Sequence, residues 1–345
     1  MGNGKSKGSS SKSNGLQHLA HLEGKNYQDM KNMNLDDLKT PISTDYAKHF
    51  VSRGLLFDEY DIFKNCKQFT YGGRGENCGI SKVGIKRLIK EQAAFPALLP
   101  LHPDSSVFVR VDENTPTAMQ ALVVGPAGTP YAQGCFLFDI LCEDYPNRPP
   151  QVTLSTTGHG AVRFNPNLYD SGYVCLSLLG TWPGQGKSEN WDKDVSSLLQ
   201  LFVSIQGLIM VDEPYYNEPG YEGSSCPEQS ESYNKNIRYQ TTKWAIVDQL
   251  NNPPKGFEEV IKLHFQLQKD SILEQTKKWM EEHGESGKKL LKEVEKVLEK
   301  NGEPPKLKNE KKEKKETKEK GKEKEKEEKK EESKESKRKM KITLW

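Results

Sequence analysis

One cysteine, Cys175, follows a turn-rich stretch of the chain that has the parts for acyl-thioester chemistry. Asn167 lies eight residues before it, in the segment RFNPNLYDSGYVCLSLLGTW (163–182). Pro166 fixes φ and Gly172 permits a tight turn, so we expect an irregular but rigid loop. A cysteine thiolate is a nucleophile, and a side-chain amide can stabilise the oxyanion of a tetrahedral intermediate. Because a lone cysteine is often only core filler, this pattern alone leaves packing and catalysis open.

The composition favours a reduced intracellular protein without a metal or cofactor. The 345 residues carry 51 basic and 49 acidic side chains, a balance that gives no reason to expect a nucleic-acid partner. Six cysteines without C-x-x-C spacing fit neither a disulfide scaffold nor a zinc site. The chain does not open on an apolar signal peptide, and the apolar stretch 197–211 is too short to span a bilayer. We therefore expect a cytoplasmic or nuclear location.

The first fifteen residues are predicted to be disordered, because they are almost entirely Gly, Ser, Lys and Asn. They open with M-G-x-x-x-S, the N-myristoylation pattern, with Gly2 as the acceptor and Ser6 in place. The alternative is a merely flexible basic terminus. One acyl chain gives only marginal binding, so the pattern predicts at most a weak membrane association, helped by Lys5, Lys7 and Lys12.

The residues around the cysteine loop divide into an extension and a domain. Segment 16–79 is rich in aromatic residues and is expected to form short helices at most, packed on the domain that follows. Ser81 is typical of a helix N-cap, with Val83, Leu88 and Ile89 expected on one face of the helix. Four strand-like runs separated by turn signals follow, at 107–111, 119–124, 136–140 and 152–154. Such short connections favour an antiparallel meander.

Helices are predicted after the cysteine loop. A buried helix is expected at 195–210, with apolar residues over much of its surface: Leu198, Leu199, Leu201, Phe202, Ile205, Leu208 and Ile209. Further helices are expected at 233–250, 257–268 and 272–283, which together with the strands predict an α+β domain. An amphipathic helix at 284–302 precedes a Lys/Glu-rich tail at 303–345, which is predicted to be disordered.

In combination, these pieces resemble the ubiquitin-conjugating (E2, or UBC) domain. The motifs that carry the resemblance are GPAGTPYAQGCFLFDI (125–140), YPNRPP (145–150) and FNPNLYDSGYVCL (164–176). One branch of the family, that of the very large inhibitor-of-apoptosis E2 and the hybrid E2/E3 enzymes, is most similar. Its marks are SLLGTW (177–182), the long loop to Trp191 and EPYYNEPGYE (213–222). The resemblance covers about 80–283 and implies the UBC fold: an N-terminal helix, a four-stranded antiparallel meander, the active-site loop and C-terminal helices.

The resemblance also implies an activity and roles for residues. Cys175 would accept ubiquitin from an E1 as a thioester and pass it to a substrate lysine. Asn167 would stabilise the oxyanion, and Glu218 would position or deprotonate the incoming amine. On the first helix, the basic side chains that would meet the E1 are Lys86, Arg87 and Lys90.

Several positions depart from the usual family pattern. The family's His-Pro-Asn is Asn165-Pro166-Asn167 here, and Ser177 stands where Asp is common. Asn147 replaces the aromatic residue of the family's proline loop, which is YPNRPP (145–150) here. Asp192-Lys193-Asp194 replaces the Ser-Pro-Ala that docks ligases. These changes put conventional E3 docking in doubt and favour an E2/E3 hybrid.

Three other functions remain open at this point. The chain could serve another ubiquitin-like modifier, or it could be a non-catalytic ubiquitin-binding variant, although such variants lack the cysteine. A cysteine hydrolase that pairs Cys175 with a distant His264 is the third, without a recognisable nucleophile signature around Cys175.

Overall fold

The computed structural model describes residues 44–74, 79–181, 190–221 and 225–307. One compact unit extends to Pro304, and a second, Pro305–Trp345, lies almost wholly outside the described residues. Gly2 and most of the Lys/Glu-rich tail also lie outside them, so the predictions of lipidation and disorder stay predictions. The domain boundaries drawn from the sequence stay predictions as well. No helix in the described ranges is long and apolar enough to cross a membrane.

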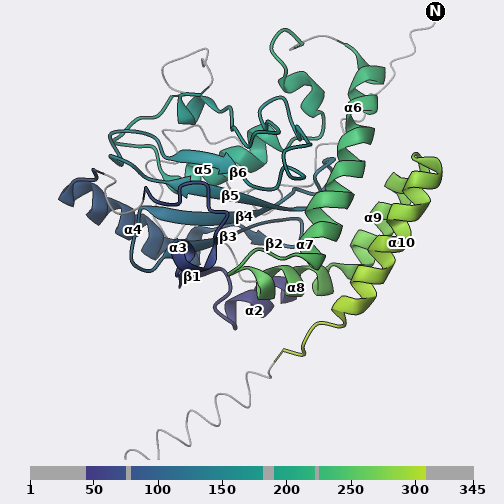
Figure 1. Ribbon diagram of the computed structural model, residues 1–345, viewed down its shortest axis with the longest axis horizontal. Coiled ribbons are helices and arrows are strands. Elements are labelled where there is room, and N and C mark those ends of the chain that lie inside the picture. The colour runs from purple at the N-terminus through teal and green to yellow at the C-terminus, as the bar shows by residue number, and fades with distance from the viewer. Residues whose placement is uncertain (1–43, 75–78, 182–189, 222–224, 308–345) are drawn as a thin grey trace, which may run out of the picture. The chain divides into compact units, whose positions relative to one another are not determined.

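A six-stranded sheet forms the centre of the first unit (Figure 1). The strands are β1 (Phe57–Tyr60), β2 (Leu101–His102), β3 (Ser105–Asp112), β4 (Ala118–Val124), β5 (Cys135–Leu141) and β6 (Gln151–Leu154). Strands β3 to β6 pair in sequence order and antiparallel, which confirms the predicted meander. The short β2 pairs antiparallel and β1 pairs in parallel with the edge of β3 that lies opposite β4. The expectation of helices at most before residue 80 was therefore wrong, because that segment also supplies β1.

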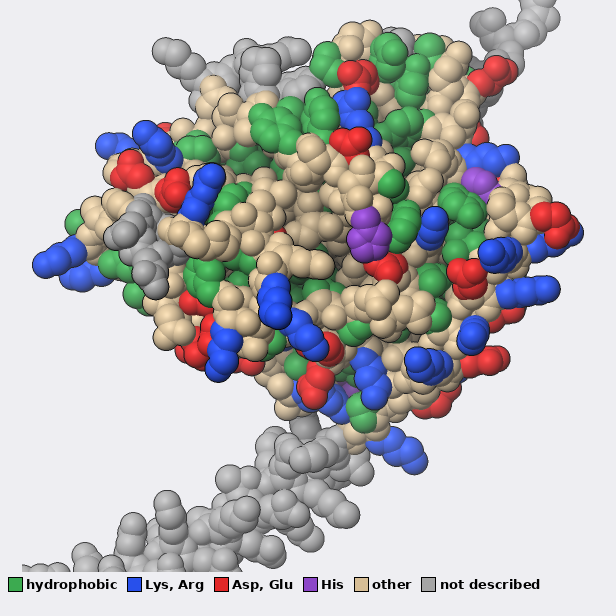
Figure 2. Space-filling model, viewed as in Figure 1, with side chains coloured by type: hydrophobic (Ala, Val, Ile, Leu, Met, Phe, Trp, Pro, Cys, Tyr) green, Lys and Arg blue, Asp and Glu red, His purple; other side chains and the backbone are tan. Residues whose placement is uncertain are grey.

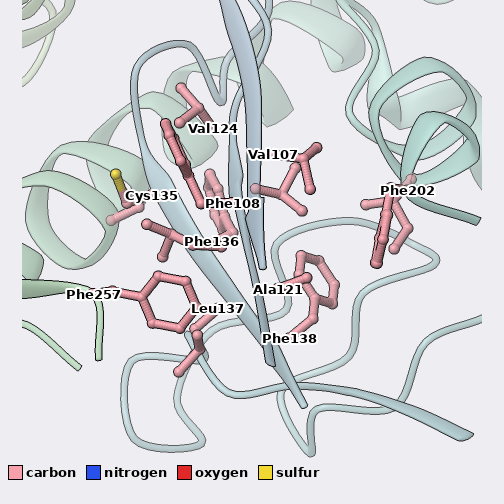
Figure 3. Packing of buried hydrophobic residues seen from close by; sticks show 14 of the residues in the cluster. Val107, Phe108, Ala121, Val124, Cys135, Phe136, Leu137, Phe138, Phe202 and Phe257 are labelled. Atoms are coloured by element: carbon pink, nitrogen blue, oxygen red, sulfur yellow. The ribbon is translucent and has the colours of Figure 1, made fainter. Parts of the chain in front are cut away.

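One face of the sheet packs against α4 (Lys82–Leu98) and α5 (Leu198–Ser204). Phe95 of α4 and Phe202 of α5 meet edge to face, with ring centroids 5.8 Å apart. Figure 3 shows Phe202 on this side of the strands, near Ala121. A T-shaped ring pair of this kind stabilises a core by about 0.5–1.5 kcal/mol beyond the area that it buries.

The opposite face is covered by segments from both ends of the unit. Phe50 of α2 (Asp45–Val51) packs on Phe108 of β3, with centroids 4.8 Å apart. From the C-terminal side, the Phe257 ring lies 5.0 Å from the guanidinium of Arg110, and Figure 3 shows this ring on the far side of the strands from Phe202. The N-terminal extension thus packs on the domain as predicted, and the sheet is buried on both faces.

Two buried carboxylates fasten the extension to the sheet. Asp112 of β3 accepts hydrogen bonds from the backbone N–H groups of Ile62 and Phe63 in α3 (Ile62–Asn65). Asp139 of β5 accepts from the backbone and hydroxyl of Thr70. A buried carboxylate is tolerated only when it is hydrogen-bonded, so these contacts define where the extension lies.

Helix α4 buries a different stripe from the predicted one. Ser81 caps the helix as expected, since its side chain accepts from the Gly84 N–H at 3.0 Å. The buried residues are Gly84, Leu88, Gln92 and Phe95. Val83 and Ile89 were expected beside Leu88, but they are 77% and 49% exposed. Gly84 explains why the buried stripe is rotated from the predicted one. The helix backbone at Gly84 lies so close to the Tyr145 carbonyl that a Cβ there would overlap it.

The predicted helix at 195–210 is α5 followed by a π-helical turn, η5 (Ile205–Ile209). A π-turn inserts one residue relative to an α-helix and so rotates the residues beyond it. Leu208 was predicted to be buried but is 63% exposed, which is the result of this rotation. The extra turn therefore brings an apolar side chain to the surface.

The remaining helices form the C-terminal part of the unit. They are α6 (Pro227–Gln240), the π-helical η7 (Thr241–Val247), α7 (Asp248–Asn251), α8 (Glu258–Leu267), α9 (Lys269–Glu281) and α10 (Gly284–Asn301). Helices α9 and α10 lie side by side along one edge (Figure 1). Figure 2 shows acidic and basic side chains interspersed over them, which agrees with short-range ion pairs such as Lys278–Glu274.

His264 of α8 is fully buried between the two ends of the unit. Its Nδ1 is 2.9 Å from the Tyr46 hydroxyl, and its Nε2 is 3.3 Å from the Gln133 carbonyl oxygen. Burial disfavours the imidazolium and lowers the pKa of His264 to about 4. The unfolded chain, with an ordinary histidine pKa, therefore binds a proton at a pH where the folded protein does not.

This depressed pKa predicts an acid-sensitive stability. The stability gained by keeping His264 neutral is fully present above the pKa that this histidine has in the unfolded chain. It is lost as the pH falls from about 6.5 towards 4. Between pH 7.5 and 5, wild type should lose about 2 kcal/mol more of its unfolding free energy than His264→Gln, measured by urea denaturation. Equal losses in the two proteins would show that His264 does not bear on acid stability.

Candidate active site

The loop after β6 brings Cys175 and Asn167 together. The Cys175 N–H donates to the Asn167 carbonyl at 2.9 Å, which closes the eight-residue separation into a contact. Gly172 turns the loop with φ +87°, and a Cβ there would lie 2.6 Å from the Leu154 carbonyl oxygen, so only glycine fits without a shift. Cys175 is 6% exposed as a whole residue, and its thiol donates to the Thr181 carbonyl at 3.2 Å.

The Asn167 amide points at the cysteine backbone. Its Nδ2 donates to the Cys175 carbonyl at 2.9 Å, while its buried Oδ1 has no hydrogen-bond partner within the described residues. The carbonyl that holds the amide belongs to the same residue as Sγ, so the Asn167 side chain lies close to the thiol. Hydrogen bonds of this kind often become productive only when the substrate is bound.

Asn165 stands at the position of the family's histidine, and its side chain anchors the loop. Its Oδ1 accepts from the Asn167 N–H at 2.8 Å, and its Nδ2 donates to the Ile209 carbonyl at 2.7 Å and lies 2.9 Å from the Tyr131 hydroxyl. The side chain is completely buried. The loop that holds Asn167 is thus fixed by the side-chain amide of Asn165.

Glu218 lies beside this loop, where it forms an ion pair with Arg163. It follows the 3-10 turn η6 (Pro214–Asn217), and its Oε2 is 3.2 Å from Nη2 of Arg163. The same Nη2 donates to the Pro166 carbonyl at 2.7 Å, and the guanidinium lies 4.3 Å from the centre of the Tyr169 ring. Sequence reasoning singled out Glu218 but missed Arg163 and Tyr169, whose only signal was their place in the same loop.

The surroundings of Cys175 have opposing effects on its thiol. Burial raises the pKa of Cys175 above its ordinary value, and this effect dominates. A hydrogen bond from Tyr169 and the positive charge of Arg163 act in the other direction and limit the rise in the pKa. The thiol of Cys175 therefore holds its proton more tightly than the thiol of a free cysteine does.

An open pocket adjoins Asn167 and the residues that follow Cys175. Its lining residues are Asn167, Leu176, Ser177, Leu208, Ile209, Tyr216 and Asn217. The π-turn that exposes Leu208 therefore shapes this pocket. The pocket thus leaves open space beside the Asn167 side chain.

The three basic residues predicted for α4 differ in their availability. Lys86 and Lys90 are exposed. Arg87 is engaged within the chain: its Nε pairs with Glu91 Oε1 at 3.0 Å, and its Nη groups donate to the carbonyls of Ser196, at 2.6 Å, and Lys193. Arg87 therefore fastens the loop before α5 onto α4.

Glu91 links this loop to the proline loop. It accepts from the Tyr145 hydroxyl at 2.7 Å and from the Leu198 N–H, at the start of α5, at 3.0 Å. Trp191 packs on Tyr145 and donates to the Pro146 carbonyl at 2.7 Å. The Asn147 side chain turns back to Asp144, to which it donates at 2.9 Å.

The hydrolase alternative has no support in this geometry. A Cys–His pair needs the imidazole within hydrogen-bonding reach of the thiol. His264 is fully buried, with its two ring nitrogens directed at Tyr46 and Gln133. The Cys175 thiol instead donates a hydrogen bond to the Thr181 carbonyl. Across the described part of the chain, no cluster of three or more His, Cys, Asp or Glu side chains is arranged to hold a metal ion.

Comparison with known proteins gives matches over the domain that contains the cysteine loop. Residues 87–241 match the family model described as "Ubiquitin-conjugating enzyme". The human protein named "Dual E2 ubiquitin-conjugating enzyme/E3 ubiquitin-protein ligase BIRC6" is 44% identical over 245 residues, which are 67% of this chain and 5% of that protein. "Probable ubiquitin-conjugating enzyme protein 17" of Caenorhabditis elegans is 45% identical over 201 residues, 57% of this chain and 27% of that protein.

A viral protein, "Probable ubiquitin-conjugating enzyme E2 R521" of Acanthamoeba polyphaga mimivirus, is 40% identical over 240 residues, 68% of this chain and 16% of that protein. The chain thus spans only a small part of the length of these relatives. What it shares with them is the domain built on the antiparallel meander and the cysteine loop. Through this α+β domain, the chain belongs to the family of ubiquitin-conjugating enzymes.

Proposed function

We propose that the chain is an E2 that accepts ubiquitin from an E1 as a thioester on Cys175 and transfers it to a substrate lysine. The observation that supports this best is the Asn167 amide, held 2.9 Å from the Cys175 carbonyl by a loop with a buried anchor. The two groups have the chemistry and the proximity that thioester aminolysis requires.

The proposed reaction has two acyl-transfer steps. In the first, the Cys175 thiolate attacks the carbonyl of the E1–ubiquitin thioester, and the E1 cysteine leaves as a thiolate. In the second, a lysine amine attacks the carbonyl of the Cys175 thioester, Asn167 donates to the oxyanion, and the C–S bond breaks. Glu218 takes part by binding the incoming amine or accepting its proton.

Charging with a panel of modifiers tests this proposal. The purified chain would be incubated with ATP, a modifier and the matching E1, and analysed on reducing and non-reducing gels. A reductant-sensitive adduct with ubiquitin supports the proposal. An adduct with another ubiquitin-like modifier alone would favour the alternative substrate, and no adduct with any would favour a non-catalytic binding variant.

For E1 recognition, we propose that Lys86 and Lys90 face the acidic surface of the E1. Both are exposed on α4, whereas Arg87 is held by Glu91 and by the carbonyls of Lys193 and Ser196. Arg87 would then act indirectly, by keeping α4 and the following loop in place.

We further predict that a RING domain does not accelerate discharge. Asn147 stands where an aromatic anchor would dock, and its side chain donates a hydrogen bond to Asp144. In the 192–194 loop, the Lys193 carbonyl accepts a hydrogen bond from Arg87. Loss of an anchor residue at an interface typically costs 2 kcal/mol or more, which weakens binding by about thirtyfold. Single-turnover discharge to lysine, with and without a generic RING domain, measures the effect.

An ordinary E2 that the same RING domain stimulates serves as the positive control, and Asn147→Phe provides a gain-of-binding variant. Stimulation of the wild-type chain as strong as that of the control would exclude the E2/E3 hybrid. In the hybrid, the segments that flank the domain would recruit the substrate.

For location, we propose a cytoplasmic enzyme that associates weakly with membranes through a myristoylated Gly2. A single acyl chain binds marginally, and nearby lysines add attraction to anionic lipid. The intact mass of the protein from its native cell would show the acyl group, and an unmodified Gly2 would leave only a basic leader.

A further inference from the structure

Arg163 occupies the side of Glu218 that faces the catalytic loop. Its Nη2 lies 3.2 Å from Glu218 Oε2 and also donates to the carbonyl of Pro166, the residue before Asn167. The Arg163 and Glu218 side chains are 42% and 39% exposed, so a solute can reach the ion pair. The acidic group assigned to the incoming amine is thus already paired with a cation from this chain.

An acceptor lysine would compete directly with this guanidinium. At neutral pH its ammonium carries the same charge as Arg163 and, like it, is only a donor of hydrogen bonds. Resting on the proposed function, we propose that Arg163 is a specificity-determining residue that holds Glu218 until an acceptor ammonium displaces it. The site would then discriminate against free amines and favour lysines whose other contacts hold them at the loop.

The other contacts of Arg163 allow this exchange without unfolding the loop. When Glu218 is released, the guanidinium keeps the Pro166 carbonyl and the Tyr169 ring, whose centre is 4.3 Å away. Only the half-exposed ion pair is lost. Pairs of this kind contribute at most about 1 kcal/mol, which corresponds to about a fivefold effect on competition. An acceptor bound by other contacts can overcome a barrier of this size, whereas a free amine is slowed by it.

Discharge of the purified Cys175–ubiquitin thioester to free lysine tests the proposal. In Arg163→Met, the rate constant per unit of lysine concentration should rise about two- to fivefold. Arg163→Lys keeps the charge and should restore a rate close to that of wild type. In a Glu218→Gln background, Arg163→Met should have no further effect, because there is no carboxylate to release.

Two controls separate this role from a general loss of charge or structure. Hydroxylamine is an uncharged nucleophile at neutral pH, so its discharge rate should not change in Arg163→Met. Arg148→Met removes the same charge from the ion pair with Asp144, which precedes β6, and should leave discharge to lysine unaltered. An unfolding midpoint of Arg163→Met in urea close to that of wild type would show that its domain is intact.

The proposal would be overturned if Arg163→Met slowed lysine and hydroxylamine discharge alike, or left both unchanged. It would also be overturned if the gain persisted in the Glu218→Gln background. Failure of the wild-type chain to form a thioester would instead overturn the proposed function, and this inference with it.

Discussion

Cys175→Ala should abolish the ubiquitin adduct completely, because Cys175 is the cysteine of the loop that also holds the Asn167 amide. Cys175→Ser should either abolish the adduct or leave an oxyester that resists reductant, since a hydroxyl is a far weaker nucleophile than a thiolate. E1-dependent charging, followed on gels with and without reductant, measures both results. An undiminished thioester on Cys175→Ala would refute the site.

Two other free cysteines provide matched controls. Cys66 and Cys226 are partly exposed, as a modifiable thiol would need to be. Burial and nearby carboxylates raise the pKa of Cys66 to about 11, so it is a poor nucleophile at neutral pH. Cys66→Ser and Cys226→Ser should therefore charge like wild type. Loss of the adduct in either variant, with Cys175 intact, would move the acceptor thiol to that position.

The contact between Cys175 and Asn167 and the antiparallel meander were predictable because their signals are local. Cys175 and Asn167 lie in one loop whose turn residues are visible in the sequence, and strands β3 to β6 are joined by short turns. Asn165 was recognised as a departure from the family pattern. Its replacement of the histidine was not predictable, because its partners Tyr131 and Ile209 are 34 and 44 residues away.

Other features depend on long-range geometry that no single segment encodes. Strand β1 pairs with β3 across about fifty residues, and its sequence FDEY shows little apolar alternation. Arg163 meets Glu218 across 55 residues, so a charged loop residue gave no sign of its role. Leu208 follows an apolar helical pattern, and only the π-turn η5 turns it outward to the pocket at Asn167.

Asn167→Ala should slow lysine discharge far more than it slows charging. Its Nδ2 is the side-chain donor nearest the carbonyl of Cys175, and removal of one oxyanion donor typically costs about 10²–10³ in rate. Its Oδ1 has no partner within the described residues, so the variant deletes little else from the folded structure. The lost bond to the Cys175 carbonyl should cost about 1 kcal/mol of stability, too little to unfold the domain.

Single-turnover experiments separate the two steps. The thioester is first formed with the E1, and its decay is then followed after addition of lysine, for wild type and variant. Asn167→Asp preserves the shape of the side chain but removes the N–H donors, so it should be as slow as Asn167→Ala. Asn217→Ala is the matched control, because this neighbouring amide lines the same pocket but donates to the Leu208 and Ile209 carbonyls and to Asn165 Oδ1, not to Cys175.

The effects of Asn167→Ala on charging and on discharge distinguish a role at the oxyanion from a role in holding the loop. If Asn167 acts on the oxyanion during aminolysis, discharge falls by at least about a hundredfold while Asn217→Ala stays near wild type. If Asn167 only holds the loop, charging and discharge fall together, and Asn165→Ala, which removes the anchor of the Asn167 backbone, has the same effect on both. Equal discharge by Asn167→Ala and wild type would leave the oxyanion without a side-chain donor and would assign Asn167 to packing.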